Sequence, residues 1–110
     1  MKSIQNPTIP NDLYENCYWQ NTVGCASNLA ICNAAANADA PILLICENNE
    51  AVEQSIRELK YFCSAHKQLP VFSLPDWETL PYDNFSPHQD IISERLNALF
   101  HLPQLERGIL

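Results

Sequence analysis

The chain has 110 residues, an apolar fraction of 46% and a formal net charge of -7 at pH 7. This length supports one hydrophobic core, and the apolar fraction excludes a wholly disordered chain. Its 13 acidic residues outnumber six scattered cations. Direct binding of this segment to DNA or RNA is therefore not expected, because proteins that bind the phosphate backbone cluster Lys and Arg.

Cysteine usage and hydropathy indicate the compartment. The cysteines are odd in number, and no apolar signal run follows the start of the sequence. These features predict a reduced, cytoplasmic protein. The longest apolar stretch, residues 41–46, is far shorter than the roughly 20 residues that cross a bilayer, so no membrane segment is expected.

The first forty residues predict an arm followed by a helix. Residues 1–10 contain two prolines and no apolar periodicity, which is typical of an extended arm. Residues 11–20 have apolar spacings that favour a short amphipathic helix or turn packed on the core. The Ala-rich residues 26–38 predict a helix that packs closely against a sheet. We expect one α/β subdomain over residues 11–110.

Three apolar segments predict strands. Residues 41–46 form a continuous apolar run that follows an alanine-rich helix, which favours a central parallel strand covered on both faces. Residues 69–74 have weaker strand propensity and predict a second, short strand. Residues 107–110 resemble the beginning of a further strand, so we expect the chain to be a fragment of a larger multidomain protein.

Two further helices are predicted between and after these strands. Asn48 or Asn49 can cap a helix with one apolar face that ends near His66. Ser86 as N-cap, followed by Pro at the first helical position and Gln at the third, predicts a helix over residues 87–101 with an apolar face. The alternation of helices with buried strands predicts an α/β fold, a three-layer, mostly parallel sheet that is incomplete at the C-terminal end.

The loop that leads into the first helix is where such a sheet would hold a phosphate. A working phosphate loop needs several glycines, a Lys and a Ser or Thr hydroxyl for magnesium. Only one glycine is present here, and no Lys lies between Lys2 and Lys60. The degenerate positions are Gly24, Cys25, Ala26, Ser27 and Asn28. We expect a structural turn with no bound cofactor.

No catalytic or metal site is predicted. Residues 71–78 end in acidic side chains like a magnesium-binding strand, but Pro75 interrupts the segment, so a solvated acidic loop is the better interpretation. Cys63 and His66 make one possible ligand pair, which is too few for a metal site. The spacing of cysteines and histidines does not indicate a nucleophile with a base.

The aromatic loop, residues 76–88, is the candidate contact surface. Trp77, Tyr82, Phe85 and His88 lie within it, and Trp and Tyr are over-represented at interface hot spots. Two interpretations stay open. The favoured one is that these side chains cover the sheet edge or pack against an adjacent domain, and the other is that they contact a partner in another chain.

Residues 75–96 read PDWETLPYDNFSPHQDIISERL. This stretch, a fifth of the chain, resembles the pattern DWETLPYD-FSPH-DI-S-RL of bacterial transcription-repair coupling factors (Mfd). The resemblance implies the N-terminal region of that family, with a UvrB-like first subdomain: a degenerate P-loop NTPase or helicase-like fold that has lost its phosphate-binding residues. Residues 107–110 also resemble the strand that continues in this family.

The resemblance further implies the role of the whole protein. Such a protein is an ATP-dependent DNA translocase that removes stalled RNA polymerase from DNA lesions and recruits UvrA for nucleotide excision repair. ATP and magnesium serve its distant motor, so this segment is expected to be a non-catalytic scaffold in contact with other domains of the same protein. RNA polymerase, DNA and UvrA are partners of the whole protein, and UvrA-binding residues are expected beyond Leu110. The alternatives are an ATP-binding helicase lobe similar to UvrB and an unrelated module that binds a peptide through the aromatic loop.

Overall fold

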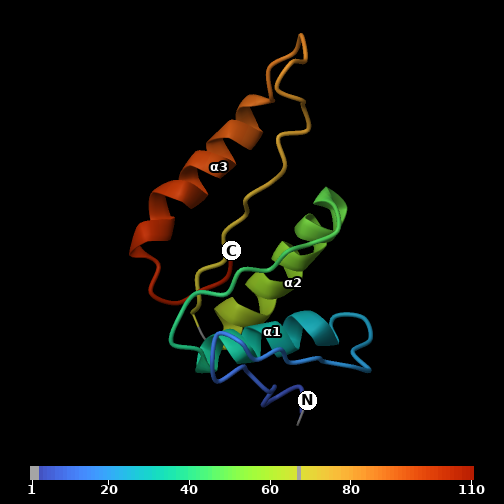
Figure 1. The fold of residues 1–110 in the computed structure, drawn as a ribbon, viewed down its shortest axis with the longest axis vertical. Helices are drawn as coiled ribbons and strands as arrows, with labels where there is room; N and C mark the ends of the chain where they lie inside the picture. The colour runs from blue at the N-terminus through green and yellow to red at the C-terminus, as the bar shows by residue number, and fades with distance from the viewer. Residues whose placement is uncertain (1–2, 67) are drawn as a thin grey trace.

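Residues 3–66 and 68–110 are described by the computed structural model, which contains helices α1 (Ala26–Asn37), α2 (Asn49–His66) and α3 (Gln89–His101). A 3-10 turn, η1 (Leu102–Gln104), follows α3. Helices α1 and α2 pack together at one end, whereas α3 and the loop before it extend toward the other end (Figure 1). The radius of gyration is 15.3 Å, compared with about 13 Å for a compact chain of this length. The molecule is therefore elongated.

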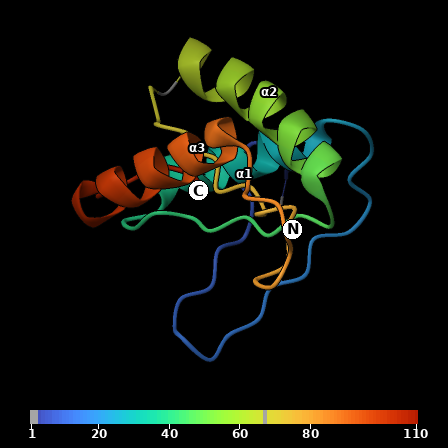
Figure 2. The same ribbon diagram turned by 90° about the horizontal axis from the view of Figure 1, so that it is seen from above.

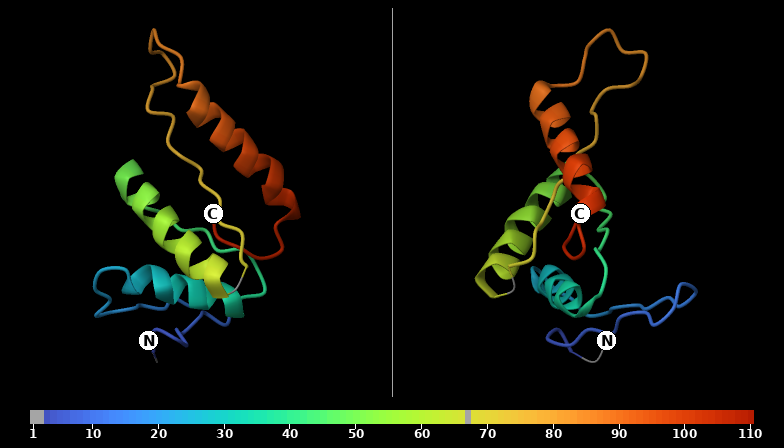
Figure 3. Two further views of the ribbon diagram at one scale, coloured as in Figure 1. Left: turned by 180° about the vertical axis from the view of Figure 1, so that it is seen from behind. Right: turned by 90° about the vertical axis from the view of Figure 1, so that its left-hand side faces the viewer.

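The core lies where α1 crosses α2 (Figure 3). In α1, Ala30 and Ala35 are fully buried, and such small side chains allow another helix to approach closely. Leu59 of α2 is 1% exposed and supplies the largest buried side chain there. The predicted Ala-rich helix is confirmed, but it packs against α2 rather than against a sheet.

The predicted three-layer, mostly parallel α/β sheet is wrong. Within the described residues there are only isolated parallel bridges, which join Ile109 to Ile42 and to Val71. The backbone hydrogen bonds at these bridges are 2.8–2.9 Å long. Residues 108–110 lie between residues 41–46 and residues 69–74, so residues 41–46 are not central in the pairing. With so few paired residues the segments make bridges and no sheet.

The apolar run of residues 41–46 is covered on one face only. Ile42 and Leu44 pack against the core, whereas Leu43 is 65% exposed and Ile45 is 84% exposed. The predicted covering of both faces is wrong, because the side chains of Leu43 and Ile45 are exposed.

Helix α2 agrees closely with its prediction. Its bounds, Asn49–His66, match the expected helix, and Asn48 is the cap that forms: its Oδ1 accepts a hydrogen bond from the Ala51 amide at 2.9 Å. This bond satisfies one of the donors that a helix leaves unpaired at its N-terminus.

Helix α3 begins later than predicted. It begins at Gln89, and His88 is the N-cap, with its Nδ1 accepting from the Asp90 amide at 3.2 Å. The capping box that begins at Ser86 is therefore wrong. An imidazole nitrogen can accept this bond as a side-chain oxygen does, which makes the two-residue shift possible.

Helix α3, orange to red in Figure 2, follows residues 68–88 and continues into η1 and residues 105–110. It packs against neither α1 nor α2 in the part of the chain that the structure describes. The rings of Phe72 and His101 stack with centroids 5.1 Å apart. Three apolar side chains of the predicted buried face point into solvent, with exposed fractions of 62%, 50% and 69%: Leu96, Leu99 and Phe100.

Of the helix and the turn that the sequence allows for residues 11–20, the structure has the turn. Asp12 Oδ1 accepts a hydrogen bond from the Tyr14 amide at 2.7 Å, and such a local turn competes with helix formation. Leu13 and Tyr14 are 97% and 92% exposed, so these two side chains do not pack on the core, whereas Cys17 and Trp19 are half-buried. Residues 1 and 2 of the predicted arm lie outside the described residues, and the division into an arm and a subdomain stays a prediction.

Candidate functional site

The loop that leads into α1 is a tight turn. Gly24 has φ 60°, in the left-handed region that glycine adopts readily, and the Ala26 amide then donates to the Val23 carbonyl at 3.2 Å. Cys25 precedes α1 without a side-chain capping bond, and both Gly24 and Cys25 are exposed. Ala26 and Ser27 are half-buried in the first turn of α1.

Asn28, the last position of this loop, contacts α2. It is 8% exposed, and its Nδ2 donates a 2.6 Å hydrogen bond to Oε2 of Glu58. Gln54 Nε2 donates to the other oxygen of the same carboxylate at 3.0 Å. The hydrogen bond from Asn28, and then the one from Gln54, hold the pKa of Glu58 below its usual 4.5. A carboxylate is thus held at the first turn of α1, where its negative charge would repel a phosphate.

Sequence reasoning did not identify Glu58. The i,i+4 spacing of Gln54 and Glu58 was a signal for a polar pair on α2. The bond to Asn28, however, depends on how α1 and α2 pack, and no pattern in either helix fixes that register. Through Asn28, residues 24–28 supply a contact between two helices.

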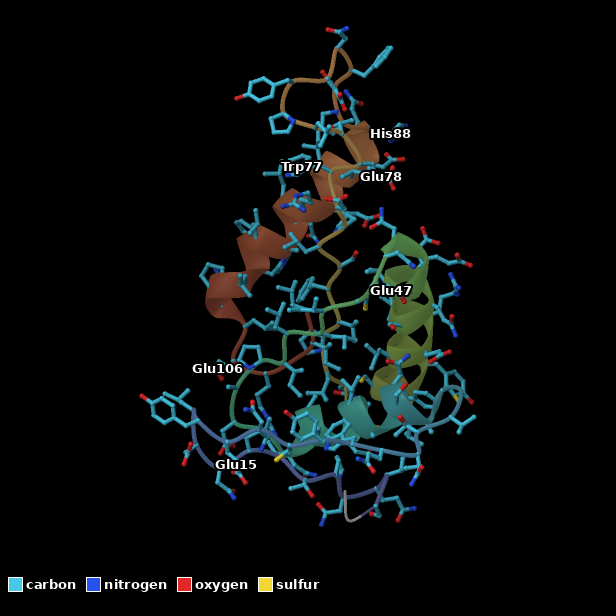
Figure 4. All side chains as sticks on the ribbon, turned by 45° about the vertical axis from the view of Figure 1, so that its right-hand side comes forward. Glu15, Glu47, Trp77, Glu78, His88 and Glu106 are labelled. Carbon is cyan, nitrogen blue, oxygen red and sulfur yellow. The ribbon has the colours of Figure 1, made fainter. Side chains whose placement is uncertain are left out.

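The aromatic loop is fixed to α3 through Trp77. The guanidinium carbon of Arg95 lies 4.4 Å from the centre of the Trp77 ring, a cation–π geometry, and Arg95 also donates to the Pro75 carbonyl. Trp77 is 41% exposed and lies beside the first turns of α3 (Figure 4). Arg95 Nε is buried and has no hydrogen-bond partner among the described residues.

The same loop also contacts α2. Asn49 Nδ2 at the start of α2 donates to Oε1 of Glu78 at 2.7 Å. Glu78 itself has φ 60°, an unusual conformation for a residue with a side chain, at the point where the loop turns away from the helices. This acidic residue therefore joins the loop to α2.

The tip of the loop projects into solvent. Asp83 closes a turn there, because its Oδ2 accepts from the Leu80 amide at 2.7 Å. Tyr82 and Phe85 are 97% and 82% exposed. The predicted contact residues are thus not one cluster: Trp77 packs on Arg95, His88 caps α3, and the other two aromatic rings project from the tip.

A groove of about 560 Å³ lies between α2 and α3. Its apolar lining comes from both helices and from residues 71–75, and its charged lining is mostly acidic. The acidic side chains are Glu53, Glu78, Asp90 and Glu94. Within residues 3–66 and 68–110, no group of three or more potential ligands is arranged to hold a metal ion, and no helix is long and apolar enough to cross a membrane.

Comparison with known proteins places the chain in a family. It is 37% identical over 103 residues to the transcription-repair-coupling factor of Escherichia coli (strain K12), an alignment that covers 94% of the chain and 9% of that protein. It is 42% identical over 104 residues to the transcription-repair-coupling factor of Haemophilus influenzae, covering 94% of the chain and 8% of that protein. The chain belongs to the transcription-repair-coupling factor family. The transcription-repair-coupling factor of Myxococcus xanthus is 33% identical over 88 residues, covering 77% of the chain and 7% of that protein.

These matches confirm the resemblance seen in residues 75–96 and extend it. The chain spans less than a tenth of the length of the transcription-repair-coupling factors that it matches. An alignment of 104 residues leaves about six of the 110 residues outside, so residues 21–29 and 75–88 both lie within the matched region. No model of a known protein family matches the chain.

Proposed function

We propose that this segment is a non-catalytic scaffold of a transcription-repair-coupling factor, which contacts other domains of the same protein through α3 and the aromatic loop. The observation that carries the proposal is the exposed apolar face of α3. Leu96, Leu99 and Phe100 are each at least half exposed on that helix. Contiguous apolar surface of this kind marks an interaction site on a soluble protein.

The total exposed area supports the same conclusion. The chain exposes 8282 Å², whereas a compact monomer of 12.5 kDa exposes about 6200 Å². The difference, roughly 2000 Å², is within the range that permanent protein contacts bury. Part of the apolar exposed surface is on α3 and its preceding loop, and part is on residues 13–23 and 43–45.

The role of the whole protein is proposed from the names of its relatives and from the resemblance described above. We infer that the whole protein is an ATP-dependent DNA translocase that removes stalled RNA polymerase from DNA lesions and recruits UvrA. ATP and magnesium would then be bound by its motor, outside this segment. RNA polymerase, DNA and UvrA are proposed as partners of the whole protein.

Hydrogen exchange tests the scaffold role directly. The amides of α3 are measured in the 110-residue chain and in the longer native protein. We expect slower exchange of α3 in the longer protein, because docking covers Leu96, Leu99 and Phe100. Equal exchange rates of α3 in the two proteins would refute the proposed contact.

A pair of charge substitutions identifies the surface. Phe100→Asp should leave the 110-residue chain unchanged within about 0.5 kcal/mol, as an exposed position does, and should restore fast exchange of α3 in the longer protein. Tyr61→Asp is the matched control, because Tyr61 lies on α2, is 71% exposed and belongs to no proposed contact. If both substitutions act alike, the contact is not on α3.

The alternative, an ATP-binding lobe similar to UvrB, is opposed by the carboxylate of Glu58 beside Asn28. A thermal-shift measurement of the chain with and without millimolar magnesium ATP distinguishes the two functions. The scaffold proposal predicts an unchanged melting temperature. A saturable rise of several degrees would show nucleotide binding and overturn it.

A further inference from the structure

Two cysteines meet at the centre of the core. Cys32 of α1 and Cys63 of α2 are 1% and 0% exposed, and their sulfur atoms lie 2.7 Å apart. This separation is closer than the van der Waals contact of two sulfur atoms. They are 31 residues apart in the sequence and belong to the only tightly packed contact between two helices in the described part of the chain.

The other three thiols have no such neighbour in the described contacts. Cys25 is exposed, and Cys17 and Cys46 are half-buried. The sulfur of Cys46 lies 4.0 Å from the Ser55 hydroxyl oxygen, which cannot form a covalent bond with it. The α1–α2 contact therefore selects a single pair out of five cysteines.

We propose that Cys32 and Cys63 form a reversible disulfide that joins α1 to α2 when the protein meets a hydroperoxide. One sulfur, as its thiolate, attacks the peroxide; the O–O bond breaks, and a sulfenic acid and an alcohol are formed. The second sulfur attacks the sulfenic sulfur, the S–O bond breaks, and water leaves. The two thiols together lose two electrons and two protons, and the hydroperoxide is reduced to the alcohol and water.

Burial determines how this reaction proceeds. A buried thiol reacts slowly, because the oxidant reaches it only when the α1–α2 contact opens locally. Once the first sulfur is oxidised and the contact closes, the second sulfur is already adjacent. Disulfide formation is then favoured over further oxidation by a second molecule of hydroperoxide.

The disulfide would close a loop of about 30 residues that contains residues 41–46 and most of α2. Closing a loop of this length restricts the unfolded chain and so raises the melting temperature. It would also hold α1 against α2 while leaving α3, outside the closed loop, free to contact other domains.

The test uses the full 110-residue chain, first reduced and then treated with hydrogen peroxide. Remaining thiols are alkylated in denaturant, and the linked peptides are identified by mass spectrometry. We expect the Cys32–Cys63 peptide as the main cross-link, with a rise of at least several degrees in melting temperature that a dithiol reverses. The same treatment in guanidinium should scatter the cross-links over other pairs, because the selecting contact is lost.

Substitutions supply the controls. Cys25→Ser removes an exposed thiol and should change neither the cross-link nor the rise in melting temperature. Cys32→Ala and Cys63→Ala should each abolish both. If a core substitution prevents folding, the proposal is still tested by comparing the cross-links and melting temperatures of the oxidised and reduced wild-type chain. Recovery of both Cys32 and Cys63 in alkylated form after oxidation, or their linkage to other cysteines, would overturn the proposal.

Discussion

Replacement of Trp77 by Ala tests whether the aromatic loop is held by α3. The side chain is 41% exposed, so about 59% of its surface is covered in the chain. For a residue of about 250 Å² this is roughly 150 Å², or about 3.7 kcal/mol at about 25 cal/mol per Å². The compactness of the unfolded chain reduces that figure by up to about 40%, and the contact with Arg95 adds about 0.5–1 kcal/mol. We expect Trp77→Ala to lower the free energy of unfolding by about 3–5 kcal/mol.

The assay is urea unfolding of the 110-residue chain followed by far-ultraviolet circular dichroism, which does not depend on the removed fluorophore. Trp77→Phe should cost clearly less, because a ring remains beneath the Arg95 guanidinium. Tyr82→Ala, at a position 97% exposed, should change the free energy of unfolding by less than about 0.5 kcal/mol. The reasoning about the loop is wrong if Trp77→Ala changes the free energy of unfolding as little as Tyr82→Ala does and also leaves the hydrogen exchange of α3 in the longer protein unchanged.

Three further changes test the core, the turns and the charge at α1. Leu59→Ala should destabilise the chain by about 2–5 kcal/mol in urea unfolding, because the side chain is fully buried; a smaller loss would mean that the α1–α2 contact is loose. Gly108→Ala should cost more than Gly24→Ala in thermal unfolding, because an added Cβ at Gly108 lies 2.7 Å from a backbone oxygen and at Gly24 meets nothing within 4 Å; equal costs would contradict this packing. The pKa of Glu58 is lowered on folding, so its stabilisation is present above its unfolded pKa of 4.5 and is lost as pH falls through the folded value. Glu58→Gln should therefore reduce the difference in stability between pH 7 and pH 3, and an unchanged pH dependence would remove Glu58 as its source.

The helices could be predicted because their signals are local. Asn48 and the apolar spacing that follows it are enough to place α2, and alanine content is enough to place α1. The start of α3 was missed by two residues, because Ser86 and His88 can both accept a capping hydrogen bond and the sequence gives no rule for choosing between them.

The sheet could not be predicted reliably, because strand propensity describes a surface that must meet a partner. Residues 41–46 have that propensity, but within residues 3–66 and 68–110 their only backbone partner is residues 108–110. Leu43 and Ile45 are left uncovered as a result. A run of apolar residues thus predicted burial correctly for one face and wrongly for the other.

The candidate sites show the same division. The lack of a Lys near Gly24 was visible in the sequence, but the carboxylate of Glu58 beside Asn28 was not, since it depends on the packing of α1 on α2. Likewise the sequence predicts Trp77 as a contact residue but not its contact with Arg95. Arg95 lies 18 residues later, on α3, and reaches Trp77 because α3 lies beside residues 75–77.

The two ends of the segment are held with different strength, and this difference bears on its role. At one end α1 and α2 share a buried core, whereas α3 is held by the stack of Phe72 on His101 and by the contacts of Arg95 with the segment before it. Elements with few buried contacts open most readily, and binding stabilises the closed form. Helix α3 is therefore expected to open more readily than the α1–α2 core, and the proposed contact with another domain would stabilise it. In the proposed scaffold, Arg95 would link a contact made by α3 to the aromatic loop, because its guanidinium lies over the Trp77 ring.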